Sequence, residues 1–231
     1  MIEVKHVVKK YRKIKALDDV SVNIEEGKIT CILGINGVGK STLLKSIMGL
    51  IPLNSGEILI DGEKTGPEVY NKISMVPDVD IHYRKMTIEE IFDFMEIFYK
   101  NWDMDKAYRM LEYFRLSKEE KISELSKGGA ARVQLITGFA QNSKYLLLDE
   151  PFSGIDLFTR EDFIGAITGE FLEEGSSIIL TTHEIGEIEH IADNVILMGN
   201  GKIIKVFSAE QEREESGKSI VDVMREEYRN E

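Results

Sequence analysis

The chain has 231 residues, of which 42% are hydrophobic and 30% are charged, a balance typical of a folded domain rather than a disordered chain. Its 29 Lys and Arg against 41 Asp and Glu give a net charge of −12, which argues against nucleic acid as a partner but leaves room for a local basic groove that binds a phosphorylated ligand. One cysteine, Cys31, excludes an internal disulfide, and no apolar run approaches the roughly 18 residues that cross a membrane. Because the first residues also lack the pattern of a secretory signal, we expect a soluble, cytoplasmic protein.

The first third of the chain is typical of short strands separated by turns, with one helix. The segment Lys28–Leu33 is an apolar run that predicts a buried strand, and a glycine-rich turn follows it. Turn residues bracket the later strands, and Pro77 stops the last of them. We expect strands at residues 4–8, 16–24, 28–33, 57–60 and 73–76, and a helix over about 39–50.

The middle of the chain has a helical pattern and many aromatic residues. From Thr87 to about Leu116, apolar side chains recur three and four positions apart, which is the spacing that helix packing requires. We interpret most of these aromatics as the core of an inserted helical lobe. Another helix is expected to begin at Ser126.

The last third alternates apolar runs with helical stretches. Such alternation predicts a mainly parallel sheet covered by helices on both faces, an α/β fold. Asn200-Gly201 is typical of a hairpin turn, and the charged stretch from Ala209 is expected to be helical. The expected strands are 145–148, 177–181, 195–198 and 202–206.

The turn after residue 33 fits the phosphate-loop pattern G-x-x-x-x-G-K-[ST] in full. Its glycines let the backbone N–H groups point inward at phosphate oxygens, and the helix that follows adds the positive end of its dipole. Lys40 would supply a charge to the β and γ phosphates, and the Ser41 hydroxyl would ligate Mg²⁺. The motif runs Gly34, Ile35, Asn36, Gly37, Val38, Gly39, Lys40, Ser41.

A second element narrows the chemistry to nucleotide hydrolysis. Leu146–Leu148 is an apolar strand that ends in two carboxylates, Asp149 and Glu150. Asp149 at the strand end can hold the Mg²⁺ shell, and Glu150 can polarise the water that attacks the γ-phosphate. A small-molecule kinase is the competing reading, but it would need a basic lid and an acceptor pocket.

These motifs, with others in order along nearly the whole chain, resemble the ATP-binding cassette (ABC) family, and specifically the nucleotide-binding subunits of ABC transporters. Leu125–Gly129 (Leu-Ser-Lys-Gly-Gly) resembles the family signature Leu-Ser-Gly-Gly-Gln. Tyr11 resembles the aromatic that stacks on adenine, and Asp156, after Ser153-Gly154-Ile155, belongs to a stretch resembling the one that contacts the opposite subunit. His183, after Thr181-Thr182, resembles the switch histidine.

The resemblance implies a fold, cofactors and site residues. The fold would be a P-loop NTPase, one domain over 1–231, with a mainly parallel core sheet and an N-terminal antiparallel β subdomain in 1–86 and 144–231, and an inserted α-helical subdomain at about 87–143. ATP and Mg²⁺ would be bound, with Lys40, Glu150 and His183 as the catalytic residues and Ser41, Asp78 and Asp149 near the metal. Besides the phosphate loop, the nucleotide contacts would come from Tyr11, Thr42, Ser126, Gly128, Gly129 and Asp156.

The signature also makes physical sense by itself. Ser126 stands where a helix should begin, and Gly128 and Gly129 would leave the N–H groups of its first turn exposed as a second anion site. Two phosphate-binding helix ends for one nucleotide indicate a head-to-tail dimer, in which the signature of one copy covers the γ-phosphate held by the other.

Two positions depart from the family pattern. Asp78 follows Pro77 where the family usually has Gln, so it either ligates the metal directly or the loop has lost part of its sensing role. Lys127 replaces a glycine of the signature, and its ammonium either attracts phosphate or points to solvent.

The expected function is an ATPase that drives a separate integral membrane subunit from the cytoplasmic face of the membrane, together with a second ABC subunit, identical or paralogous. The partner would dock in the groove between the Asp78 loop and the helical lobe, with the loop Asp80–Lys85 coupling the two. By resemblance to bacterial exporters, the cargo would be drugs or peptides. The alternative is a soluble ABC ATPase of cofactor or cluster assembly that moves no solute.

Overall fold

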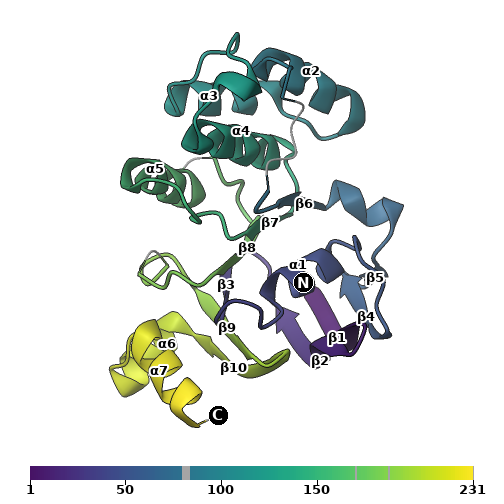
Figure 1. The fold of residues 1–231 in the computed structure, drawn as a ribbon, viewed down its shortest axis with the longest axis vertical. Coiled ribbons are helices and arrows are strands. Elements are labelled where there is room, and N and C mark those ends of the chain that lie inside the picture. Colours follow the sequence, from purple (N-terminus) through teal and green to yellow (C-terminus); the bar gives the residue numbers. More distant parts are fainter. Residues whose placement is uncertain (80–83, 170, 187, 231) are drawn as a thin grey trace. The chain divides into compact units, whose positions relative to one another are not determined.

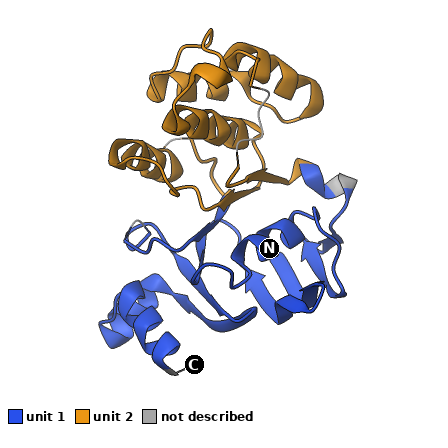
Figure 2. Cartoon of the chain, in the orientation of Figure 1, with its two compact units in different colours: residues 1–70, 177–231 blue, residues 71–176 orange. Residues whose placement is uncertain are grey.

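A computed structural model describes residues 1–79, 84–169, 171–186 and 188–230 (Figure 1). The chain forms two compact units, shown in different colours in Figure 2. Unit 1 comprises Met1–Tyr70 and Ser177–Glu231, and unit 2 comprises Asn71–Ser176.

Unit 1 begins with an antiparallel sheet whose strand order is β2-β1-β4-β5. Its β1 does not alternate regularly, because His6 has a φ of 50° and the register shifts between Val4 and Val7. As a result Val4 and Val7, three positions apart, are both buried. The strands are β1 (Ile2–Tyr11), β2 (Ile14–Ile24), β4 (Ser55–Ile60) and β5 (Glu63–Lys64).

The other strands of unit 1 lie in the order β10-β9-β3-β8. β3 is parallel to both neighbours, and β9 and β10 form the predicted antiparallel hairpin. Cys31 in the centre of β3 is fully buried, which raises the pKa of its thiol. The strands are β3 (Ile29–Leu33), β8 (Ser177–Thr182), β9 (Asn194–Gly199) and β10 (Lys202–Ser208), and the helices are α1 (Lys40–Ile47), α6 (Ala209–Ser216) and α7 (Ile220–Asn230).

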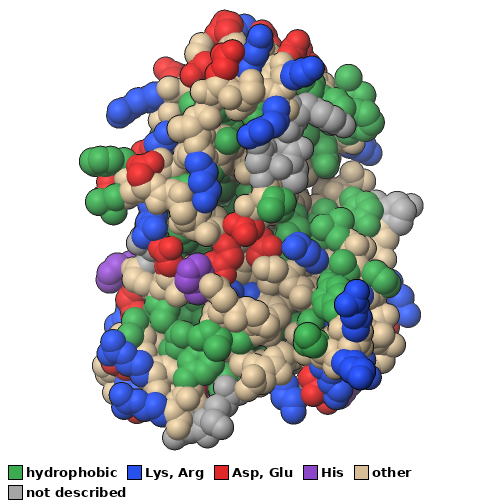
Figure 3. All heavy atoms as spheres, in the orientation of Figure 1, with side chains coloured by type: hydrophobic (Ala, Val, Ile, Leu, Met, Phe, Trp, Pro, Cys, Tyr) green, Lys and Arg blue, Asp and Glu red, His purple; other side chains and the backbone are tan. Residues whose placement is uncertain are grey.

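Unit 2 is mainly helical and contains the parallel pair β6 (Ile73–Val76) and β7 (Tyr145–Asp149). Helix α4 packs on β6 at Gly138, where a side chain would run into Val76. The helices of unit 2 are α2 (Ile88–Phe98), α3 (Met104–Tyr113), α4 (Lys127–Ala140) and α5 (Leu157–Thr168). On the part of unit 2 that carries α2 and α3, Figure 3 shows acidic and basic side chains side by side.

The stretch 87–116, predicted to be helical, contains two helices, α2 and α3. α2 begins at Thr87 with a capping box, in which Thr87 Oγ1 accepts from the Glu90 N–H and Glu90 Oε2 accepts from the Thr87 N–H. α3 begins after Asp103, whose Oδ1 accepts from the Lys106 N–H at 2.8 Å.

The expectation that the aromatics form the lobe core is confirmed for several of them. The Phe92 ring lies 5.8 Å from the Trp102 ring and 5.6 Å from the Tyr108 ring, and it is fully buried. Phe98 at the end of α2 is instead 66% exposed, so the lobe also presents aromatic surface.

The prediction of an α/β fold with a mainly parallel sheet and an antiparallel sheet is confirmed. The domain limits expected from the sequence stay a prediction. No helix within the described ranges is long and apolar enough to cross a membrane.

Candidate functional site

The phosphate-loop sequence lies between β3 and α1, as predicted, and two of its glycines are required by close packing. A side chain on Gly34 would come within 2.6 Å of the Met198 carbonyl oxygen, and one on Gly39 would run into the Ala16 carbonyl oxygen. Gly39 also has a φ of 110°, which disfavours any other residue. Ile35, Asn36 and Gly37 are exposed, whereas the side chain of Val38 is buried beneath the loop.

Lys40 is the first residue of α1, and its side chain points back toward the phosphate loop. Its side chain is 5% exposed, and its Nζ donates to the Gly34 carbonyl at 2.7 Å. Gly39 precedes the helix without a side chain that could cap it, and the first turn contains no acidic residue. The positive end of the helix dipole and the ammonium therefore meet at a backbone cradle, an arrangement that fits a phosphate chain. Ser41 and Thr42 are half-buried in the same turn.

Tyr11 and His183 belong to the same unit as the phosphate loop. Leu33 pairs with Thr182 in the parallel β3 and β8, so the phosphate loop and His183 both leave the carboxyl edge of neighbouring strands. His183 is exposed, and the turn before it is closed by the Glu184 N–H donating to Thr182 Oγ1. Tyr11, at the end of β1, is 47% exposed. The strand β2 paired with it carries Ala16, whose carbonyl borders Gly39.

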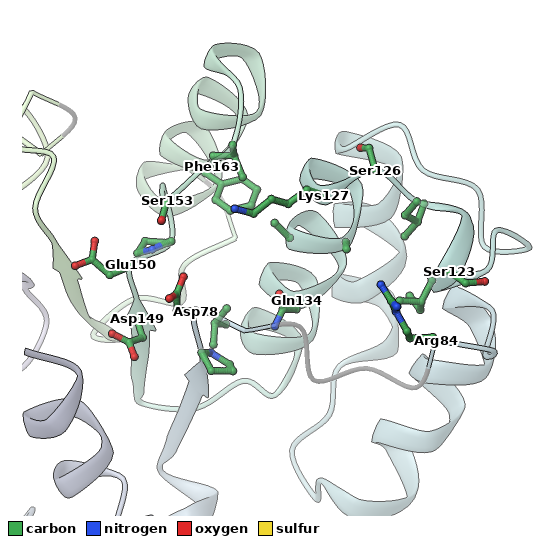
Figure 4. Close-up of a pocket in the computed structure, with 18 residues that line it drawn as sticks. Asp78, Arg84, Ser123, Ser126, Lys127, Gln134, Asp149, Glu150, Ser153 and Phe163 are labelled. Atoms are coloured by element: carbon green, nitrogen blue, oxygen red, sulfur yellow. The ribbon is translucent and has the colours of Figure 1, made fainter. Parts of the chain in front are cut away.

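Three carboxylates gather at the carboxyl edge of β6 and β7 in unit 2. Val76 pairs with Leu148, so Asp149, the last residue of β7, and Asp78, two residues after β6, lie at the ends of adjacent strands. Asp149 is 2% exposed and Asp78 is exposed. Glu150 has a φ of 49°, a left-handed conformation that is uncommon for a residue other than glycine. Figure 4 shows all three carboxylates on the same side of a pocket.

This pocket has a volume of about 300 Å³ and lies within unit 2. It is lined by the carboxylates, by the signature segment and by two residues that the motifs did not indicate, Arg84 and Gln134 (Figure 4). Gln134 Nε2 donates to the Val79 carbonyl at 2.7 Å, so α4 holds the segment that contains Asp78. Neither residue has a local sequence signal, because its place in the pocket depends on tertiary packing.

Ser126 caps α4, as predicted. Its Oγ accepts from the Gly129 N–H at 3.1 Å. The expectation that both glycines leave exposed N–H groups is wrong for Gly129, whose N–H is taken by this cap, and both glycines are buried. Gly128 has a packing role, because a side chain there would lie 2.9 Å from the Thr159 hydroxyl.

Lys127 is exposed, as one of the two alternatives expects, and its attraction to phosphate stays a prediction. Its Nζ lies so close to Gly154 that a side chain on that glycine would run into it. Lys127 therefore extends toward the loop after Glu150, as Figure 4 shows.

Asp156 is the N-cap of α5. Its Oδ1 accepts from the Thr159 N–H at 3.0 Å, and its Oδ2 accepts from the Thr159 hydroxyl at 2.7 Å. These hydrogen bonds hold the pKa of the Asp156 carboxyl below its ordinary value. Any contact of Asp156 with nucleotide stays a prediction.

The site residues thus form two groups, one in each unit. The phosphate loop, Tyr11 and His183 belong to unit 1, and Asp78, Asp149, Glu150, the signature and Asp156 belong to unit 2. Part of the loop predicted to couple to a partner, Asp80–Tyr83, and His82 within it lie outside the described residues.

Comparison with known proteins identifies the scaffold that carries these groups. The family model described as "ABC transporter" matches residues 17–153, more than half of the chain. The chain belongs to the ABC transporter family. The matched range includes the phosphate loop, Asp149 and Glu150 of this ABC chain, while Tyr11, Asp156 and His183 lie outside it.

Curated relatives and solved structures agree with the family. The ABC transporter ATP-binding protein YtrB of Bacillus subtilis is 32% identical over 93% of this chain and 74% of its own length. The petrobactin import ATP-binding protein YclP of the same organism is 31% identical over 89% of this chain and 86% of its own. A dimeric structure of MJ0796, a bacterial ABC transporter cassette, superposes with a TM-score of 0.81 at 26% identity and covers 90% of this chain and 98% of that one. The chain is an ABC ATPase with a P-loop NTPase fold.

Proposed function

We propose that this chain is the ATP-hydrolysing subunit of a membrane transporter and that two copies, or this chain and a paralogue, close around MgATP. The observation that carries this proposal is the presence of two glycine-rich helix starts in one chain, one at Lys40 and one at Ser126. At the first, the side chain of Lys40 donates to the Gly34 carbonyl of the preceding glycine turn, and the second begins a helix capped by its own serine. Dimeric MJ0796 supports the association of two such cassettes.

In unit 1 the residues of the phosphate loop bind the triphosphate. Lys40, which donates to the Gly34 carbonyl, turns its ammonium to the β and γ phosphates when they enter, because phosphate is the stronger acceptor. The N–H groups of the loop and of the first turn of α1 contribute the remaining donors. Ser41 offers its hydroxyl to the metal, Tyr11 stacks on the base, and His183 contacts the γ-phosphate end.

In unit 2 the carboxylates act on the metal and the water. Mg²⁺, when bound, lowers the negative charge that an attacking water meets at the γ-phosphate. Asp149, buried at the end of β7, would hold the Mg²⁺ shell, for which one or two carboxylates suffice. Glu150 accepts a proton from the attacking water and orients it. Asp78 lies beside them and would contribute to the metal shell.

The transport partner would be a separate membrane protein that receives the opening and closing of the dimer at the cytoplasmic face. Ile97 and Phe98 at the end of α2, and Val79 after β6, are 76%, 66% and 64% exposed, and such apolar surface in unit 2 supports docking there. Export of drugs or peptides is the finer prediction. The relatives do not distinguish export from import, since one of them is named for petrobactin import and another for lipopolysaccharide export.

The test is Glu150→Gln, compared with Glu161→Gln on the exposed side of α5. We expect Glu150→Gln to bind ATP with unchanged affinity, to hydrolyse it at least about 100-fold more slowly, and to accumulate as an ATP-dependent dimer in light scattering. Glu161→Gln should behave as the native chain does. Unchanged turnover in Glu150→Gln would refute its role as general base, and absence of ATP binding by the native chain would refute the function as a whole.

A further inference from the structure

The helix α7 near the end of the chain reaches back to the phosphate loop. Tyr228 on α7 donates its hydroxyl to the Met198 carbonyl oxygen at 2.5 Å. Met198 lies in β9 next to Leu197, which pairs with Leu33 at the end of β3. The carbonyl that Tyr228 holds is therefore beside the residue from which the phosphate loop starts.

The same hydroxyl also faces Gly34 directly. A side chain on Gly34 would lie 2.6 Å from the Met198 oxygen and 3.1 Å from the Tyr228 hydroxyl oxygen. Gly34 therefore faces both the Met198 carbonyl and the Tyr228 hydroxyl that donates to this carbonyl. Because Lys40 bonds to the carbonyl of the same glycine, the position of Gly34 also sets the position of the ammonium.

α7 is anchored at its other end, so that Tyr228 is not on a loose terminus. Ile220 and Val223 are buried, and the Ile220 N–H donates to Glu189 Oε1 at 3.1 Å. Arg213 of α6 donates to the Glu189 carbonyl at 3.1 Å. Glu189 lies in the segment that follows His183, so the pair α6 and α7 contacts this segment as well as the start of the phosphate loop.

We propose that Tyr228 is a positioning residue for the phosphate loop: through the Met198 carbonyl and the face of Gly34, its hydroxyl keeps the first turn of the loop in the conformation that accepts a phosphate chain. This inference rests on the proposed ATP-binding function. It adds to the site a residue that lies outside the family match and outside every motif discussed above. The competing explanation is that Tyr228 only packs α7 against the rest of unit 1 and has no effect on the phosphate loop.

The test removes the hydroxyl alone with Tyr228→Phe. The matched control is Tyr113→Phe in unit 2, because Tyr113 also donates its hydroxyl to a backbone carbonyl, that of Asp162, at 3.2 Å. We expect the affinity for ATP, measured by calorimetry, to fall about fivefold in Tyr228→Phe, the factor that one ordinary hydrogen bond is worth. KM for ATP should rise by the same factor with kcat unchanged, because the loop then binds the ground state and the transition state less tightly by the same amount. Tyr113→Phe should change neither.

A second readout needs no nucleotide. Amide hydrogen exchange of peptides covering residues 34–40 should be faster in Tyr228→Phe than in the native chain, while peptides from β1 and β2 exchange at the same rate in both. A lower melting temperature with unchanged KM and unchanged exchange of the loop would show a packing role and overturn the proposal. If the native chain failed to bind ATP, the proposed function would fall, while the exchange data would still show whether Tyr228 holds the loop.

Discussion

The ammonium of Lys40 donates a hydrogen bond of 2.7 Å to the carbonyl oxygen of Gly34, six residues earlier in the same loop. The Ile35 carbonyl lies 3.4 Å from the same nitrogen. A charge on a side chain that is only 5% exposed must have polar partners, and these carbonyls contribute to that requirement. The loop therefore already holds a cation against its own backbone carbonyls.

Replacing Lys40 by Met should abolish most of the affinity for ATP while leaving the fold intact. The thioether chain fills the same volume, so the loss is one of charge and of hydrogen bonds to phosphate, and we expect at least about tenfold weaker binding in calorimetry. Lys45→Met, in the last turn of the same helix, is the control and should bind ATP as the native chain does. Equal binding by the two variants would contradict the role of Lys40.

Gly39→Ala should destabilise the protein more than Gly37→Ala, although both glycines have positive φ in the same loop. At Gly37 a side chain meets no atom within 4 Å, so alanine there carries only the conformational cost of about 1–2 kcal/mol. At Gly39 the side chain also runs into the Ala16 carbonyl, and we expect a total of at least about 3 kcal/mol. Urea unfolding of both variants measures the difference, and equal midpoints would show that the loop shifts without cost.

The cap formed by Asp156 should make stability depend on pH in the acid range. The ordinary pKa of the carboxyl is 3.8, and the hydrogen bonds from Thr159 lower it in the folded state. A lowered folded pKa means that the contribution is complete well above 3.8 and is lost as the pH falls below 3.8 toward the folded value. In Asp156→Asn the side-chain oxygen still caps the helix, but the side chain has no carboxyl group that titrates. The difference in unfolding midpoint between the two proteins should therefore shrink from pH 6 to pH 3, and a constant difference would contradict this account.

Lys106 tests whether an ion pair between a buried ammonium and an exposed carboxylate stabilises unit 2. Its side chain is 2% exposed and its Nζ donates to Asn142 Oδ1 at 2.6 Å and to Glu173 Oε1 at 2.7 Å. Asn142 and Glu173 are exposed and can turn to water when the ammonium is removed. We therefore expect Lys106→Met to change stability by less than about 1 kcal/mol, and Lys106→Ala, which leaves a cavity, to cost about 2–4 kcal/mol. Thermal unfolding distinguishes the two, and an equally large loss in both would show that the ion pair itself is stabilising.

The parts of the fold that the sequence predicts well are those in which burial and local turn chemistry agree. β3 and β7 are mostly apolar runs bounded by glycine or acidic residues, and the predicted ranges 28–33 and 145–148 agree to within one residue with the observed Ile29–Leu33 and Tyr145–Asp149. The break between α2 and α3 was not expected, because the aromatic residues continue through it and only Asp103 signals the new helix. Similarly, the irregular register of β1 depends on the left-handed backbone at His6, for which the sequence has no sign.

The candidate site likewise has residues that the sequence predicts and residues that it does not. The phosphate loop and the cap at Ser126 follow from residues adjacent in sequence, and local geometry is enough to predict them. Gln134 and Arg84 reach the pocket of unit 2, and Tyr228 reaches Gly34, only because distant segments fold together. The hydrogen bond from the Gly129 N–H to Ser126 Oγ was not predicted, because a helix cap and an anion site use the same backbone N–H groups.

The fully enclosed position of Cys31 has a practical consequence for labelling. Its thiol is shielded in the middle of β3 and is protonated at neutral pH, because burial raises its pKa, so maleimide reagents should leave the native chain unmodified. A cysteine introduced at an exposed position such as Asn36 would then carry a spectroscopic label at one known place. Pulsed electron paramagnetic resonance then measures the distance between the labels on two copies of the chain, and Cys31 does not have to be replaced first.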